Sequence, residues 1–360
     1  MTAAHLVLAD GAVYRGEAFG APAEAFGEVV FNTSMMGYQE MLTDPSYAGQ
    51  IVVPTYPLQG NYGVAAQDVE SRRVQVAGFA VRAHSATPSH YNAEATLDQY
   101  LASEGVAGVA GIDTRAVTRR IRSAGVMLGA ITSGAPDDAL ARLRSLPAYD
   151  AVDYVAQVTT TEGYAWEERA EGRVRIAVVD CGVKYNILRE LAKRGCSVSV
   201  LPATASARDV LALRPDGVVF SPGPGDPVHN DATVETARAL IDQTPILGIC
   251  LGHQVIARAM GGATYKLKFG HRGGNHPVQD LRTGRVSVTA QNHGYAVDEA
   301  GLPPTLEVTH RNLNDDTVEG LRHREAPVLT IQYHSEASPG PLDNAHVFDD
   351  FLAMVGQSAE

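Results

Sequence analysis

The sequence predicts an α/β protein: a C-terminal open, mostly parallel sheet flanked by helices, preceded by a separate mixed α/β N-terminal domain. Three observations lead to this prediction. The chain has 360 residues, of which 45% are hydrophobic, so it is long enough for two or three buried cores. Its composition changes near residue 150. From residue 173 onward, apolar runs alternate with amphipathic runs, which is typical of a parallel sheet covered by helices on both faces.

Residues 1–150 form the predicted N-terminal domain, which is rich in Gly, Ala and Val. A helix is expected to begin at Thr114, with Asp113 or Thr114 itself as its cap, and to end at Gly125. Residues 151–172 are polar and contain the only Trp, and we interpret them as a linker between domains. The strand-like runs of the first domain include residues 29–34 (VVFNTS) and 50–57 (QIVVPTYP).

Residues 173–360 form the predicted C-terminal domain, in which strands and helices alternate regularly. The predicted strands are residues 175–180, 197–203, 216–220, 245–250, 285–297, 305–312 and 328–334, and the predicted helices are residues 186–195, 207–215, 233–243 and 255–260. Because ligands bind beyond the carboxyl ends of the strands in open parallel sheets, reactive residues at strand ends are the first candidates for a site.

The charge and cysteine content exclude some classes of function. The formal net charge is −12 and the pI is near 5.4, which argues against binding to nucleic acid or to an anionic membrane. The N-terminus has no basic leader, and no apolar run approaches the length of a membrane span. With only 3 cysteines, we expect a reduced, cytoplasmic protein in which a cysteine acts as a thiol.

Cys250 ends a strand and has the form G-x-C-x-G, with Gly248 and Gly252 on either side. This is the nucleophile elbow with Cys in place of Ser, in which a sharp turn from strand to helix needs flanking glycines. We expect the turn to lift the thiol into solvent, at a helix N-terminus that favours the thiolate. The alternative interpretation is a core cysteine beside glycines that pack the helix.

His334 ends another predicted strand, and Glu336 follows two residues later. In extended chain these two side chains point the same way, so the carboxylate can orient the imidazole. A Cys/His pair oriented by a carboxylate is the general arrangement for acyl transfer to a thiol. Taken alone, however, His-x-Glu is a weak signal that favours a surface salt pair.

The glycine-rich turn SPGPGDP, residues 221–227, ends a third strand. Its backbone N–H groups, together with that of Leu251, would form an oxyanion hole if they were aimed at a developing negative oxygen. The alternative is a simple tight turn. A phosphate-binding loop is disfavoured because neither G-x-x-x-x-G-K-[ST] nor G-x-G-x-x-G occurs in the chain.

The motifs SPGPGDP, GICLGHQ and HSEASPGP together resemble the three signatures of the class I (triad-type) glutamine amidotransferase family, over about residues 173–360. The resemblance implies that Cys250 is the nucleophile, His334 the acid and base, and Glu336 the residue that orients it. Three residues depart from the family pattern: Ser335 stands where Pro is usual, Pro222 where Asn is common, and Cys181 where Phe is frequent.

Two segments of the N-terminal half and two later segments narrow the resemblance. FNTSMMGYQEMLTDPSYAGQIV, GIDTRAVTRRIR, KFGHRGGNHPV and AQNHGYAVDE are similar to the small, glutamine-hydrolysing subunit of carbamoyl phosphate synthetases, nearly end to end. This implies a heterodimer with a large synthetase subunit in arginine and pyrimidine biosynthesis. No cofactor is expected on this chain, and ATP and metal ions are expected on the large subunit. The glutamine-binding residues that the resemblance implies are Ser46, Gly223, Gly225, Leu251, Gln254, Asn292, Gly294 and Tyr295.

Two other functions stay open from the residues alone: a free-standing thiol hydrolase of the same fold, and a non-catalytic scaffold subunit. The dedicated N-terminal domain disfavours the first, and the three candidate triad residues disfavour the second. Cys181 also ends a strand but lacks the preceding glycine of an elbow, so its role is left open. His271 and His276 flank a glycine-rich segment that we interpret as a loop shaping the cleft, and no metal site is predicted.

Overall fold

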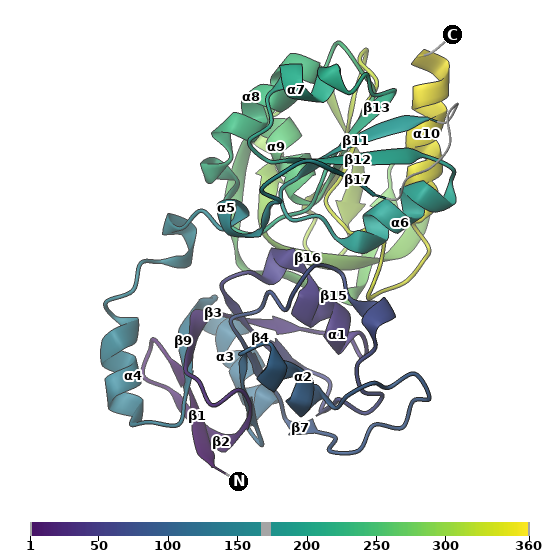
Figure 1. Ribbon diagram of the computed structural model, residues 1–360. Helices are drawn as coiled ribbons and strands as arrows, with labels where there is room; N and C mark the ends of the chain where they lie inside the picture. Colours follow the sequence, from purple (N-terminus) through teal and green to yellow (C-terminus); the bar gives the residue numbers. More distant parts are fainter. Residues whose placement is uncertain (1, 167–173, 359–360) are drawn as a thin grey trace. The chain divides into compact units, whose positions relative to one another are not determined.

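The computed structural model describes residues 2–166 and 174–358 and separates into two compact units, Met1–Val152 and Asp153–Glu360 (Figure 1). The first unit is a mixed α/β domain and the second is built around a large sheet with helices on both faces, as predicted. The assignment of residues 1–150, 151–172 and 173–360 to functional domains and a linker stays a prediction.

The first unit is a closed barrel of strands in the order β1-β2-β8-β6-β4-β3-β9. The neighbours β3–β4, β4–β6 and β6–β8 run parallel, and the other pairs are antiparallel. Closure brings β9 against both β1 and β3, a pairing that no local pattern in the sequence indicates. The strands are β1 Ala3–Leu8, β2 Val13–Gly20, β3 Ala25–Asn32, β4 Gln50–Pro54, β6 Gly78–Ala80, β8 Ala107–Ala110 and β9 Met127–Thr132.

The helices of the first unit are short, and α3 begins and ends as the sequence predicts. The Asp113 side chain accepts a hydrogen bond from the backbone N–H of Ala116 at 2.9 Å, and Gly125 follows the helix at φ 101°. The helices are α1 Tyr38–Thr43, α2 Leu97–Ser103, α3 Thr114–Ala124 and α4 Pro136–Leu143. Turns of 3-10 helix lie at Pro45–Tyr47, Ala66–Asp68 and Tyr149–Ala151. A separate two-stranded sheet consists of β5 Leu58–Gln59 and β7 Ala83–His84.

The second unit contains a 10-stranded sheet in the order β10-β12-β11-β13-β14-β19-β18-β17-β15-β16. Its centre, β12-β11-β13-β14-β19, is parallel, and the remaining pairs are antiparallel. The central strands are β12 Ser197–Pro202, β11 Arg175–Asp180, β13 Gly217–Phe220, β14 Ile246–Ile249 and β19 Val328–Ile331. The outer strands are β10 Tyr164–Ala165, β18 Val318–His323, β17 Leu306–Asn312, β15 Ala263–Asp280 and β16 Val286–Asp298.

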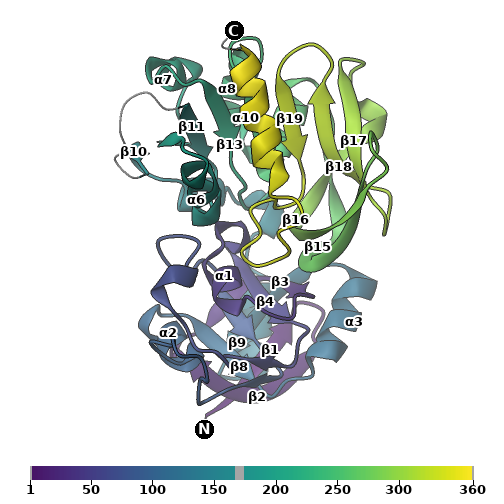
Figure 2. The same cartoon turned by 90° about the vertical axis from the view of Figure 1, so that its right-hand side faces the viewer.

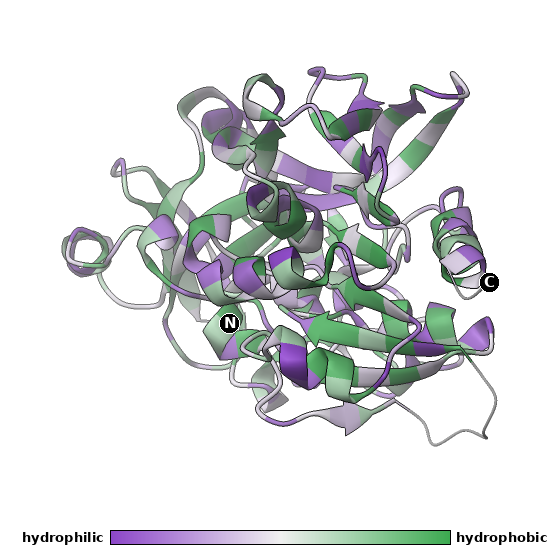
Figure 3. Ribbon diagram, turned by 90° about the horizontal axis from the view of Figure 1, so that it is seen from above, coloured by the Kyte–Doolittle hydropathy of each residue, from purple (hydrophilic) through white to green (hydrophobic). Residues whose placement is uncertain are grey.

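Helices cover both faces of the parallel centre (Figure 2). On one face, α6 (Tyr185–Lys193) and α10 (His346–Ser358) bury side chains against Val178 and Val219. The opposite face is covered by α7 (Ala207–Ala212), α8 (Asp231–Leu240) and α9 (Leu251–Ala259). Figure 3 shows the hydropathy of the ribbon, with apolar residues gathered along several strands and polar residues interspersed on the helices.

Two expectations about the outer part of this sheet are wrong. The segment around His271 and His276 is not a loop, because it lies within β15. Register shifts against β16, between Lys266 and His271 and between Gly273 and His276, interrupt the alternation that would have revealed a strand. The strand β18 was also not foreseen, since its sequence VEGLRH mixes charged residues and glycine with apolar ones.

Part of the segment interpreted as a linker is bound to the second unit. A short helix, α5 (Val155–Val158), is followed by β10, which pairs with β12. Thr159 Oγ1 donates to the backbone oxygen of Asp180, and the backbone N–H of Thr160 donates to its carboxylate at 2.8 Å. Residues 167–172 lie outside the described residues. Within the described ranges, we find no helix long and apolar enough to cross a membrane.

We expect Phe351→Ala to destabilise the second unit by about 3–5 kcal/mol. The Phe351 side chain of α10 is 0% exposed where the helix packs on the sheet, so removing the ring leaves a cavity. Urea unfolding monitored by circular dichroism measures the change. The control is Leu342→Ala, since Leu342 is 71% exposed, and its effect should stay within about 0.5 kcal/mol. Equal effects of the two substitutions would contradict the packing described here.

Candidate active site

Cys250 sits at the joint between β14 and α9 in a strained backbone conformation, with φ 54° and ψ −104°. A positive φ is uncommon for a residue with a side chain and persists only where the surroundings hold it. The flanking glycines make that possible. A Cβ on Gly252 would overlap the backbone of Phe220, and one on Gly248 would lie 2.5 Å from Ile256 Cδ1.

The thiol of Cys250 is buried, at 1% exposure, which corrects the expectation that the turn lifts it into solvent. The outer strands are the reason. The backbone oxygen of Asn292 on β16 accepts from Sγ at 3.6 Å, and Gln332 Nε2 donates to Sγ at the same distance. The sulfur therefore lies at the carboxyl edge of the parallel strands, with polar groups from β16 and from the end of β19 against it.

His334 and Glu336 form the predicted pair. The ring nitrogen Nδ1 of His334 lies 2.6 Å from Oε1 of Glu336, and both side chains are buried. Burial alone would lower the pKa of His334, but Glu336 and the adjacent Cys250 side chain outweigh it and raise the pKa to about 10. Since Nδ1 faces the Glu336 carboxylate, Nε2 is the nitrogen left to face the thiol. Within the described residues, Nε2 has no partner at the distance and angle of a normal hydrogen bond.

Lys184 completes a buried charge network that sequence reasoning missed. Its Nζ lies 3.0 Å from Oε1 of Glu336 and also donates to the backbone oxygen of Ala337. Asn186 Nδ2 donates to the backbone oxygen of Glu336 at 2.5 Å. Burial would raise the pKa of Glu336, but Lys184 and His334 hold it well below its usual range. Glu336 is thus an ionised, fixed acceptor for the imidazole.

Lys184 and Asn186 follow β11, and no motif marks them, because only the fold brings them to a residue about 150 positions away. Gln332 was also missed. In its case a signal exists, since Gln332 precedes His334 by two residues in extended chain and so points to the same side.

The glycine-rich turn after β13 lies against the elbow. A Cβ on Gly223 would be 2.7 Å from Cδ2 of Leu251 and would also overlap the backbone oxygen of Cys181. The turn and Leu251, whose backbone N–H groups are the predicted oxyanion donors, are therefore in direct contact. Gly225 has φ 84°, and a Cβ placed on it would lie 3.7 Å from the Tyr154 side chain of the same unit.

Of the predicted glutamine-binding residues on β16, Asn292 lies beside the thiol. Asn292 contacts Sγ through its backbone oxygen, and the backbone oxygen of Tyr295 accepts from Gln254 Nε2 at 2.8 Å. Gln254 Nε2 also donates to Gln332 Oε1 at 2.9 Å. The amide of Gln254 thus braces β16 against the elbow helix. Gly294 faces the Arg272 side chain.

Ser46 belongs to the first unit, in the 3-10 turn Pro45–Tyr47. Its backbone N–H donates to Asp44 Oδ1 at 2.9 Å, and its hydroxyl is buried without a hydrogen-bond partner in the described part of the chain. Its role in glutamine binding stays a prediction.

Three residues that resemble catalytic candidates are packed structural groups. Cys181 is completely buried, and burial together with Asp180 raises the pKa of its thiol far above the usual range. Burial also raises the pKa of Cys196, to about 11. His253 is fully buried, its Nδ1 lies 2.8 Å from Thr330 Oγ1, and burial lowers its pKa to about 3. None of the three has the environment of a nucleophile or a base.

Known proteins resemble this chain over nearly its whole length. Residues 177–354 match the family model for class I glutamine amidotransferases, and residues 6–131 match the model for the carbamoyl-phosphate synthase small chain, CPSase domain. The carbamoyl phosphate synthase small chain of Methanopyrus kandleri is 52% identical over 98% of this chain and 98% of its own. The chain belongs to the carbamoyl phosphate synthase small-chain family.

Other members of the carbamoyl phosphate synthase small-chain family show the same extent of similarity. The small chain of Symbiobacterium thermophilum is 53% identical, over 97% of this chain and 98% of its own. That of Bacillus caldolyticus is 52% identical, over 97% and 96%. Family membership confirms the resemblance drawn from the motifs, and it confirms that the second unit carries a class I glutamine amidotransferase domain.

The buried pair predicts a pH dependence of stability. The pKa of Glu336 is about 2 in the folded protein against 4.5 for an ordinary glutamate. Its ionised form therefore stabilises the fold above about pH 4.5, and this contribution is lost as the pH falls toward 2. We expect the difference in Tm between the wild type and Glu336→Gln to be largest at about pH 6 and to shrink as the pH falls below about 4.5. A difference that is independent of pH would contradict an ionised Glu336.

Proposed function

We propose that the second unit hydrolyses the side-chain carboxamide of glutamine, with Cys250 as nucleophile, His334 as acid and base, and Glu336 as the group that orients the imidazole. The observation that carries this proposal is the convergence of the three residues. A strained elbow cysteine lies beside an imidazole whose other nitrogen is held at 2.6 Å by a buried carboxylate. This is the arrangement that thiol acyl transfer requires.

In the first step, the Cys250 thiolate attacks the carboxamide carbon and forms a C–S bond. The carbonyl oxygen takes up the electron pair, and the backbone N–H groups of Gly223 and Leu251 stabilise the resulting oxyanion. One such donor lowers the barrier by roughly 3–4 kcal/mol. The imidazolium of His334 then gives its Nε2 proton to the departing nitrogen, so ammonia leaves rather than an amide anion.

In the second step, neutral His334 removes a proton from water, which attacks the glutamyl thioester. The C–S bond breaks, glutamate is released and the thiol is restored. Lys184 supports both steps indirectly. Because its ammonium lies 3.0 Å from Glu336, the carboxylate stays ionised while the imidazole cycles between its charged and neutral forms.

The family defines the partner of this chain as a large synthetase subunit, which uses the ammonia to make carbamoyl phosphate from bicarbonate and ATP. We propose that ATP and metal ions act on that subunit and that this chain needs neither for glutamine hydrolysis. The cytoplasmic location expected from the few reduced thiols stays a prediction. Similarity to small chains across both units disfavours a free-standing hydrolase.

The substitution Cys250→Ala tests the nucleophile in the assembled two-subunit enzyme. We expect glutamine-dependent synthesis to fall by about 10⁴-fold or more, because the covalent route is lost, while ammonia-dependent synthesis is retained. Steady-state assays with each nitrogen donor measure the two activities. The matched control is Cys196→Ala, which removes a buried thiol from the opposite edge of the sheet and should preserve both. Loss of both activities in Cys250→Ala would show that Cys250 is structural.

The substitution Ser46→Ala tests the predicted contribution of the first unit. Removing one hydrogen bond to glutamine costs about 1–1.5 kcal/mol, so KM for glutamine should rise roughly tenfold with little change in kcat. Ser103→Ala, on the exposed end of α2, is the control and should change neither constant. An unchanged KM in Ser46→Ala would remove Ser46 from the site.

A further inference from the structure

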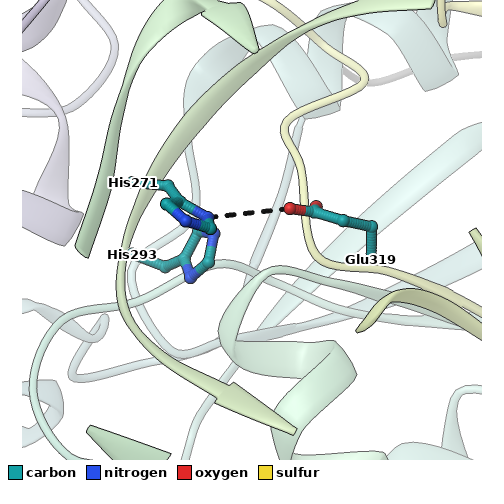
Figure 4. A group of neighbouring side chains, drawn as sticks. All are labelled: His271, His293 and Glu319. Atoms are coloured by element: carbon teal, nitrogen blue, oxygen red, sulfur yellow. Dashed lines mark ion pairs between the residues drawn. The ribbon is translucent and has the colours of Figure 1, made fainter. Parts of the chain in front are cut away.

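A second cluster of polar side chains lies in the antiparallel part of the same sheet. His271 on β15, His293 on β16 and Glu319 on β18 converge from three strands, and all three are buried (Figure 4). One ligand atom from each lies within 4.8 Å of the others, and His271 Nδ1 is 3.7 Å from Glu319 Oε1. The two imidazole rings meet edge to face, with centroids 4.9 Å apart.

Each imidazole is anchored on its outer side. His271 Nε2 lies 2.8 Å from the Asp315 carboxylate, and His293 Nδ1 lies 2.7 Å from the backbone oxygen of Tyr295. Both anchors are acceptors, so they fix the ring hydrogen on the outer nitrogen. In the neutral rings, the inner nitrogens, His271 Nδ1 and His293 Nε2, are then left as lone-pair donors. Histidines that bind metals are held in this way, with the second nitrogen donating to a carboxylate or a carbonyl.

The inside of the cluster holds more acceptors than donors, although Asn312 Nδ2 donates to Glu319 Oε1 at 2.8 Å. His271 Nδ1 is buried and has no hydrogen-bond partner within the described residues. His293 Nε2 faces Gln291 Oε1 at 2.9 Å, while the other end of that amide donates to Glu319 Oε2 at 2.9 Å. As drawn, two acceptors face each other, His293 Nε2 and Gln291 Oε1. If the Gln291 amide were flipped, its Oε1 would instead face the Glu319 carboxylate, which is also an acceptor. A cation at the centre would satisfy these lone pairs.

We propose that His271 Nδ1, His293 Nε2 and the Glu319 carboxylate bind one divalent transition-metal ion, with Zn²⁺ as the best match. Two nitrogens and one carboxylate oxygen form a common ligand set for Zn²⁺, whereas Ca²⁺ and Mg²⁺ prefer oxygen ligands alone. Ligand atoms about 2.0–2.1 Å from a tetrahedral ion are roughly 3.3 Å apart, so the cluster, whose ligand atoms lie within 4.8 Å of one another, must contract by up to about 1.5 Å. A water molecule or Gln291 Oε1 would take the fourth position.

This site goes beyond glutamine hydrolysis and does not depend on it. The ion would link β15, β16 and β18 at His293, the residue after Asn292, whose backbone oxygen contacts the Cys250 thiol. Its role would be to fix the strand beside the thiol. The ligands come from three strands and successive ones are 22 and 26 positions apart (293 − 271 and 319 − 293), so no short metal-binding motif marks them.

Equilibrium dialysis of the chelator-treated, full-length chain against Zn²⁺, read by elemental analysis, tests the site. We expect the wild type to bind one ion and Glu319→Gln to bind at least tenfold more weakly, because the substitution removes the charged ligand with little change in shape. His310→Asn is the matched control. It removes another buried imidazole of the same sheet, outside the cluster, and should bind Zn²⁺ like the wild type.

Co²⁺ provides a second measurement, whose result on the wild-type chain does not depend on how a variant folds. Bound by two imidazoles and a carboxylate, Co²⁺ in the wild-type chain should give visible ligand-field absorption that an equivalent of Zn²⁺ displaces. Stoichiometric uptake with this spectrum, lost in Glu319→Gln and kept in His310→Asn, would support the proposal. Absence of uptake by the wild type, or equal uptake by a well-folded Glu319→Gln, would overturn it.

Discussion

The close approach of the elbow helix to β13 is the constraint on which the rest of the candidate site depends. Gly252 lies so near the backbone of Phe220 that any side chain there would overlap it. Phe220 and Gly248 are paired neighbours on β13 and β14, so the strained Cys250 backbone is fixed by the parallel centre of the sheet. Strain of this kind persists only where rigid surroundings determine it. The position of the sulfur is therefore a property of the sheet.

The charges around His334 serve position more than stability. Removing Lys184, Glu336 and His334 from water is costly, and a buried ionic group seldom stabilises a protein more than an apolar group of the same size. What such a network provides is a defined geometry. Lys184 and Asn186 hold Glu336 from one side, so the carboxylate can accept from His334 only in one orientation. Positioning by a second layer of residues is common where a reaction requires fixed distances.

The sequence predicted those features that a few consecutive residues determine. The elbow at Cys250, the cap of α3 at Asp113 and the His334–Glu336 pair all follow from local rules about turns, caps and alternation. Features set by distant pairing were missed. Lys184 meets Glu336 only in the folded chain, and β15 is disguised by its register shifts. The thiol was expected in solvent because the prediction considered the elbow alone and not the strand that brings Asn292 over it.

The closed barrel of the first unit restricts how another protein can associate with it. An open sheet offers unpaired N–H and C=O groups along its outer strand, and a partner can extend it by adding a strand. In this barrel β1 is paired with both β2 and β9, so that route is absent from the barrel strands. Association through the barrel itself must therefore rely on side chains and loops, whose chemistry can diverge between relatives while the barrel beneath them stays the same.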